Sequence, residues 1–156
     1  MSDPRMSDPR VLGPDLAPTP FTAEEIRAAC PDGHRLLVRT RLGDLVTFHC
    51  NSFAAGDGDG CALTQVMTDA SGTPVDEPRT ARVTWRELQE HAAFPAAATT
   101  ISRERLASPL GELECLRYEV RRDAGTATFW FATRHPGMPV RYETADGALV
   151  EVVAIG

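Results

Sequence analysis

The sequence predicts an α+β protein, in which a curved antiparallel β-meander of about seven to nine strands carries two short helices. Short runs of β-branched and aromatic residues recur between tight turns from residue 35 onward. Turns this short join antiparallel strands, because a parallel pair needs a crossover of about a dozen residues or more. Two further segments have the capping sequence that starts a helix, and their shortness requires a sheet to dock on.

The chain of 156 residues is expected to form one α+β domain over residues 21–156. Residues 1–20 begin with a duplicated MSDPR and carry prolines at positions 4, 9, 14, 18 and 20. Because proline lacks a backbone donor and fixes φ, this segment is predicted to be a disordered tail. The duplication is typical of two alternative start methionines or of a cloning scar.

The two helix starts share one capping chemistry. Thr22 is followed three residues later by Glu25, and Thr84 by Glu87. In each pair the threonine hydroxyl accepts from the backbone while the glutamate reaches back to the cap. The first helix is predicted to end at a Pro-Asp-Gly turn and the second before a Phe-Pro pair, because the residue ahead of a proline disfavours the α region.

The strands follow from apolar patterns bounded by turn residues. They are predicted at 35–41, 45–53 and 61–68 before the second helix, and at 98–107, 112–122, 126–133, 139–144 and 148–155 after it. The apolar pattern changes phase between Cys115 and Leu116, which predicts a β-bulge there. Phe129 and Phe131 alternate with Trp130, so this strand has two apolar faces. It is predicted to lie inside the sheet, covered by a helix or by the other limb of the curved sheet.

A rigid corner follows at residues 135–139. Pro136 presets φ for the first turn position and Gly137 accepts a positive φ at the second, so hairpin mechanics explain both residues. His135 and Met138 are left displayed on the corner. His135 is expected to be a solvent-exposed turn residue.

Charge and missing motifs exclude several classes of function. With 22 acidic and 16 basic residues and a net charge of −6, the chain lacks the basic stripe that nucleic-acid binding needs. No apolar run reaches the roughly 18 residues of a membrane span, and the charged N-terminus is no secretory signal, so a cytoplasmic location is expected. The sequence has no GxSxG, HExxH, Walker or GxGxxG motif, and it predicts neither an enzyme signature nor a cofactor.

Cysteines and histidines provide one set of candidate metal ligands. Cys30 and His34 lie four residues apart, which is a spacing found in zinc sites, and Cys61 opens a later strand. His49 and Cys50 are adjacent in a strand and point to opposite faces, so at most one of them could join. The alternative is that the cysteines are small apolar core residues that stay reduced. Whether Cys30, His34, His49 and Cys61 bind a metal is left open.

The C-terminal half of the chain, SPLGELECLRYEVRRDAGTATFWFATRHPGMPVRYETADGALVEV, has a characteristic order of strands and turns. It resembles the late strands of the curved, half-open β-sheets of periplasmic lipoprotein carriers and related uncharacterised domains. In those proteins a tryptophan-bearing strand is likewise followed by a Pro- and Gly-bearing turn that leads back into the sheet. The resemblance implies a concave apolar face that shelters a lipid or another hydrophobic molecule under a lid of helices.

We therefore expect a non-enzymatic domain that binds a small apolar ligand or a protein partner on the concave face of its sheet. The candidate contact residues are Trp130, Met138 and Tyr142, with Arg141 as an anchor for an anion.

Two other hypotheses belong to different classes. The protein could serve a structural or assembly role, as a homodimer that pairs through the apolar segment 148–155 as an edge strand. It could also be a hydrolase or transferase with a dispersed site. That hypothesis requires at least one of His34, His49, His91 or His135 in a cleft beside a carboxylate or thiol with a perturbed pKa.

Overall fold

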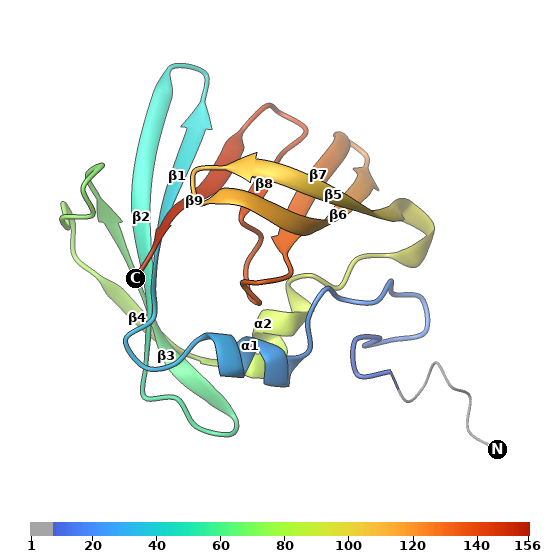
Figure 1. Ribbon diagram of the computed structural model, residues 1–156, viewed down its shortest axis with the longest axis horizontal. Helices are drawn as coiled ribbons and strands as arrows, with labels where there is room; N and C mark the ends of the chain where they lie inside the picture. The colour runs from blue at the N-terminus through green and yellow to red at the C-terminus, as the bar shows by residue number, and fades with distance from the viewer. Residues whose placement is uncertain (1–7) are drawn as a thin grey trace.

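The computed structural model describes residues 8–156 and confirms the α+β class. A single antiparallel sheet of nine strands bends into an arc, and two helices lie together across its open side (Figure 1). The strands are β1 (Arg35–Leu42), β2 (Leu45–Ala54), β3 (Gly60–Thr68), β4 (Arg79–Thr84), β5 (Thr99–Ser108), β6 (Gly111–Arg122), β7 (Gly125–Ala132), β8 (Arg141–Glu143) and β9 (Leu149–Ile155). The helices are α1 (Ala23–Ala29), α2 (Trp85–Glu90) and the 3₁₀ turn η2 (Ala96–Ala98).

The sheet consists of two meanders that meet in its middle. The strand order is β4-β3-β2-β1-β9-β8-β7-β6-β5, so the first four strands and the last five join where β9 pairs with β1. The last strand is therefore flanked by β1 and β8, and the expectation that segment 148–155 forms an edge strand is wrong. The edges of the sheet are β4 and β5.

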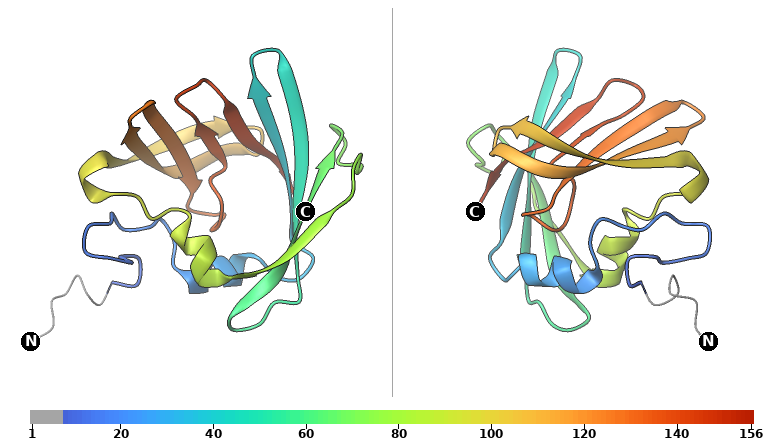
Figure 2. Two further views of the ribbon diagram at one scale, coloured as in Figure 1. Left: turned by 180° about the vertical axis from the view of Figure 1, so that it is seen from behind. Right: turned by 45° about the vertical axis from the view of Figure 1, so that its right-hand side comes forward.

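Both predicted capping boxes are present. The Thr22 hydroxyl accepts from the Glu25 backbone N–H at 3.1 Å, and the Glu25 carboxylate accepts from the Thr22 N–H at 3.0 Å. Thr84 and Glu87 repeat the arrangement, with both distances at 3.0 Å. Figure 2 shows α2 lying across the open side of the arc, on the chain that leads from β4 to β5. In the following text, the face of the sheet that is turned towards α1 and α2 is called the concave face.

The segment ahead of α1 requires a correction. Residues 8–20, assigned above to a disordered tail, pack against the domain, and Thr19 is fully buried. The Tyr118 hydroxyl donates to the carbonyl of Pro18 at 2.7 Å, and the Gln89 amide donates to that of Pro9 at 2.8 Å. Proline lacks a donor but keeps its carbonyl acceptor, so a proline-rich segment can be fixed without regular structure. The remainder of the predicted tail, residues 1–7, lies outside the described residues.

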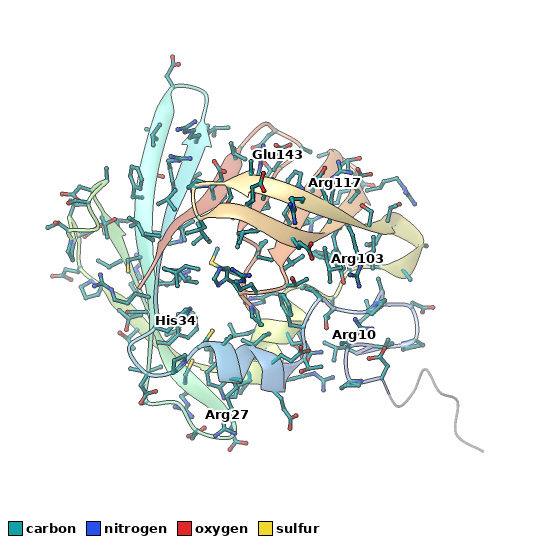
Figure 3. The ribbon with its side chains drawn as sticks, viewed as in Figure 1. Arg10, Arg27, His34, Arg103, Arg117 and Glu143 are labelled. Atoms are coloured by element: carbon teal, nitrogen blue, oxygen red, sulfur yellow. The ribbon has the colours of Figure 1, made fainter. Side chains whose placement is uncertain are left out.

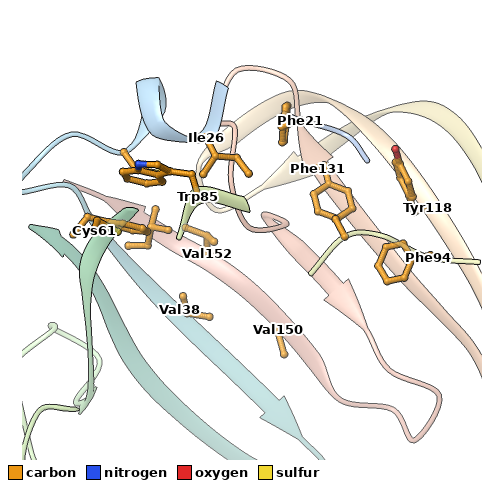
Figure 4. Packing of buried hydrophobic residues seen from close by; sticks show 14 of the residues in the cluster. Phe21, Ile26, Val38, Cys61, Trp85, Phe94, Tyr118, Phe131, Val150 and Val152 are labelled. Atoms are coloured by element: carbon orange, nitrogen blue, oxygen red, sulfur yellow. The ribbon is translucent and has the colours of Figure 1, made fainter. Parts of the chain in front are cut away.

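Strands β6 and β7 bury side chains on both faces, as the sequence predicts for β7. On the concave face, Tyr118 and Phe131 belong to the main core, which Figure 4 shows converging between the strands and the helices. On the opposite, convex face, Cys115 and Trp130 belong to a second, smaller apolar cluster.

The β-bulge predicted at Cys115-Leu116 is wrong, because the pairing of β6 with β5 and β7 runs without interruption. The change of apolar phase instead reflects a strand that contributes to the two clusters in succession. A register shift occurs in β9, where Val152 pairs with Val38 and Ala154 pairs with Leu37.

Candidate functional site: a cavity on the concave face

A cavity of about 530 Å³ lies between the concave face and the helices. Its walls come from strands of both meanders, including Leu36 of β1, Phe53 of β2, Phe129 of β7 and Val150 of β9. Ile26 of α1, Leu88 of α2 and Ala92, which follows α2, close it from the other side. The curvature of the sheet thus creates a space that these two short helices do not fill.

The loop between β7 and β8 also lines the cavity. All of its residues from 134 to 139, here called the corner loop, contribute to the wall. The Asn51 side-chain amide of β2 donates to the Met138 sulfur at 3.7 Å, so the loop spans the arc from the second meander to the first. A Cβ placed on Gly137, whose φ is 139°, would lie 3.9 Å from the Cys30 sulfur at the end of α1.

The turn chemistry of the corner loop agrees with the prediction, but its position does not. Gly137 adopts the positive φ expected of it. His135, expected to be exposed to solvent, is half-buried and lines the cavity. Hairpin geometry determines the shape of such a turn, whereas tertiary contacts such as Asn51–Met138 determine where it lies.

The polar groups of the cavity are few and mostly uncharged. The chain has four histidines, and all of them line it, namely His34, His49, His91 and His135. The Gln65 amide donates to the Asn51 side-chain oxygen at 3.2 Å, and Arg134 is an exposed residue at the margin. Within residues 8–156, no aspartate or glutamate lines the cavity.

Burial favours the neutral forms of four ionisable side chains that line the cavity. It lowers the pKa of His34, which nearby His135 lowers further, and it also lowers the pKa of His49. Burial raises the pKa of the Tyr142 hydroxyl. It also raises the pKa of the Cys30 thiol to about 11, with a smaller contribution from Cys61. Each of these four shifts favours the uncharged form of its side chain at neutral pH.

These shifts predict that the unliganded protein loses thermal stability as the pH falls from about 7.5 to about 5.5. Because the pKa values of His34 and His49 in the folded state lie below the ordinary 6.5, the unfolded chain binds more protons in this range. Hydrogen bonds lower the pKa of Asp57 and Asp69 below 3.8, so these two carboxylates titrate at a lower pH than this range. The melting temperature measured across this range should fall with pH, and His49→Gln should weaken the fall. A melting temperature that rises towards pH 5.5 would contradict the prediction.

The structure separates the four residues expected to contact a ligand. Met138 and Tyr142 line the cavity, and Tyr142 stacks on Phe129 with ring centroids 5.6 Å apart. Trp130 and Arg141 lie on the convex face, where the Arg141 guanidinium stands over the indole at 5.0 Å. Trp130 and Arg141 therefore lie outside the candidate site.

The convex-face pair has a structural environment of its own. Arg141 forms an ion pair with Glu143 at 2.6 Å, and the Trp130 indole N–H donates to Glu104. Trp130 is 6 % exposed and packs in the second apolar cluster.

Asn51 and Phe53 are absent from the predicted site residues, and His49 is predicted only as a metal ligand or as a cleft histidine of an enzyme, although the sequence holds one signal for all three. His49, Asn51 and Phe53 alternate along β2 and therefore share one face, which the structure shows to be concave. The alternation of a buried phenylalanine with two polar residues could have identified them as the polar part of a cavity wall.

The candidate metal ligands do not assemble into a metal site. Among residues 8–156, no group of three or more histidine, cysteine, aspartate or glutamate side chains is placed to hold a metal ion. Cys30 and Cys61 are buried members of the main core, 4 % and 1 % exposed. His34 packs on Phe53 with ring centroids 5.6 Å apart.

Comparison with known proteins adds no further assignment. No protein-family model matches the chain, and no curated protein matches its sequence. None of the helices in residues 8–156 has the length and apolar character that crossing a membrane requires.

Proposed function

We propose that this protein binds a small, largely apolar molecule in the cavity on the concave face. The observation that carries the proposal is the volume of about 530 Å³, which falls in the range of about 300–1,000 Å³ typical of ligand sites. Protein interiors are close-packed and leave few voids larger than a water molecule, so a space of this size is more than a local packing fault.

The chemistry of the walls supports the same proposal. Aromatic and aliphatic side chains such as Phe53, Phe129 and Val150 provide most of the surface. Asn51 and Gln65 supply a small polar patch in which each group already has a partner. A binding site for an apolar molecule has this composition, with a few placed polar groups to orient the ligand.

The resemblance of residues 108–152 to the sheets of periplasmic lipoprotein carriers favours the interpretation further. The resemblance implies an apolar concave face beneath helices. In this chain α1, α2 and the corner loop would provide the lid.

The other two hypotheses gain less support. The segment proposed for assembly, 148–155, lies inside the sheet and has strand partners on both sides. An enzyme would need an activated group in the cavity, but burial raises the pKa of the Cys30 thiol to about 11, which makes it a poor nucleophile. No carboxylate lines the cavity within residues 8–156 to act beside a histidine.

Titration with N-phenyl-1-naphthylamine tests the proposal. This uncharged dye fluoresces strongly once it leaves water, and its two ring systems are the kind of apolar body that the cavity would hold. We expect saturable binding of one dye per chain with a Kd on the order of 1–10 μM. If folded protein shows no saturable signal up to about ten times that concentration, the proposal is wrong.

A further inference from the structure

We infer that the ligand of the cavity carries an acidic headgroup, and that this headgroup lies beside His34, Arg134 and His135. The inference rests on the proposed function, because it names the chemical class of the molecule that the cavity would hold. That class is an apolar chain or ring system ending in a single carboxylate.

Apart from the Cys30 thiol and the Tyr142 phenol, the ionisable groups that line the cavity within residues 8–156 are all basic. Its lining contains the four histidines of the chain and Arg134, and within residues 8–156 no acidic residue lines it. The chain as a whole has the opposite balance, with 22 acidic and 16 basic residues. A cationic ligand would find no carboxylate here. An anion would find a guanidinium and imidazoles that can donate hydrogen bonds.

Three of these groups gather from distant parts of the chain. His34 directly precedes β1, and Figure 3 shows it on the inner side of the arc, near α1. Arg134 and His135 begin the corner loop, which belongs to the other meander. His135 is close enough to contribute, after the larger effect of burial, to lowering the pKa of His34. The corner loop thus places the His135 imidazole near that of His34, and it contributes the Arg134 guanidinium to the wall of the same cavity.

The charge of Arg134 has no acidic partner among the residues that the structure describes. No carboxylate in residues 8–156 forms an ion pair with it, whereas Arg39, Arg82 and Arg141 each pair with one. A ligand carboxylate beside Arg134 would accept charge-assisted hydrogen bonds, which are roughly twice as strong as neutral ones. An anion between His34 and His135 would also reverse their mutual electrostatic penalty, because it favours a protonated imidazole.

The number of permanent positive charges in the cavity wall favours a headgroup with a single negative charge. Arg134 is the one lining residue, within the described part of the chain, that is positively charged at every physiological pH. A phosphate monoester carries about two negative charges at neutral pH and would need a second fixed cation. A carboxylate needs one, and the apolar remainder of the lining suits a hydrocarbon body.

Decanoic acid and decan-1-ol provide the test, since they share one hydrocarbon chain and differ in the headgroup. Each compound is titrated as a competitor against N-phenyl-1-naphthylamine bound to the full chain, at about pH 7.5, where the acid is ionised. We expect the acid to bind about five- to tenfold more tightly than the alcohol. In a double variant with Arg134→Gln and His135→Gln, this preference should fall below about twofold, because the acid loses more affinity than the alcohol.

Arg103→Gln is the matched control, because Arg103 is an exposed arginine of β5 that does not line the cavity. This variant should keep the full preference for the acid. Equal affinity of the native protein for acid and alcohol, with the dye still bound and displaced, would overturn the headgroup assignment and leave the proposed function standing. An undiminished preference in the double variant would also overturn it. Failure of the dye, the acid and the alcohol to bind would overturn both proposals.

Discussion

Replacing Phe131 with alanine should lower the free energy of unfolding by about 3–5 kcal/mol. The Phe131 side chain is 2 % exposed and lies on the concave side of β7. Its ring contacts Phe21, Tyr118 and Phe129, with centroids 6.4, 5.2 and 6.3 Å away. Truncation would therefore loosen the contact between the segment ahead of α1 and two strands of the second meander. Urea denaturation followed by circular dichroism measures the loss.

Ile101→Ala is the control for this measurement. Ile101 lies on the edge strand β5 and is 39 % exposed, so its truncation should cost less than about 1 kcal/mol. If Phe131→Ala costs no more than Ile101→Ala, the placement of Phe131 at the centre of the core is wrong.

The elements of the fold could be predicted because they depend on local chemistry. The capping boxes at Thr22 and Thr84 satisfy backbone donors within three residues of each helix start, and both are present. Short turns between strands enforce antiparallel pairing of neighbours, and every hairpin of the meander follows this rule. The curved sheet with two docked helices follows from these local features.

The order of the strands depends on contacts that leave no local pattern. β9 pairs with β1 across most of the length of the chain, which moves an apparently free last strand into the middle of the sheet. Glu151 is 7 % exposed there because Arg39, 112 residues away, pairs with it at 2.9 Å. From the sequence alone, a glutamate in a strand is predicted to face solvent, and only its partner strand shows that it is buried.

The candidate site shows the same division between local and distant effects. Alternation on β7 correctly predicts that Trp130 faces away from Phe129 and Phe131, but not which of the two faces the helices cover. The turn residues Pro136 and Gly137 predict the shape of the corner loop. Its return into the concave face depends on the contact between Met138 and Asn51, 87 residues apart.

Replacing Leu63 with tryptophan should weaken binding of N-phenyl-1-naphthylamine by more than about tenfold, while the protein remains folded. Leu63 of β3 is half-buried and lines the cavity, so the indole can extend into the empty volume of about 530 Å³. A tryptophan forced into a filled core would cost about 1–3 kcal/mol in strain, whereas here open space accepts the added atoms. The dye and the indole would then compete for the same volume. Fluorescence titration gives the Kd, and urea denaturation shows whether the variant is folded.

Leu45→Trp makes the same substitution outside the cavity. Leu45 begins β2 at the hairpin with β1, is 64 % exposed and does not line the cavity, so the affinity for the dye should stay within about twofold of the native value. The pair of variants separates the site from the rest of the surface, because both add one indole and only one adds it to the cavity. If Leu63→Trp binds the dye as tightly as Leu45→Trp, the dye is held elsewhere on the protein and the cavity is not its site.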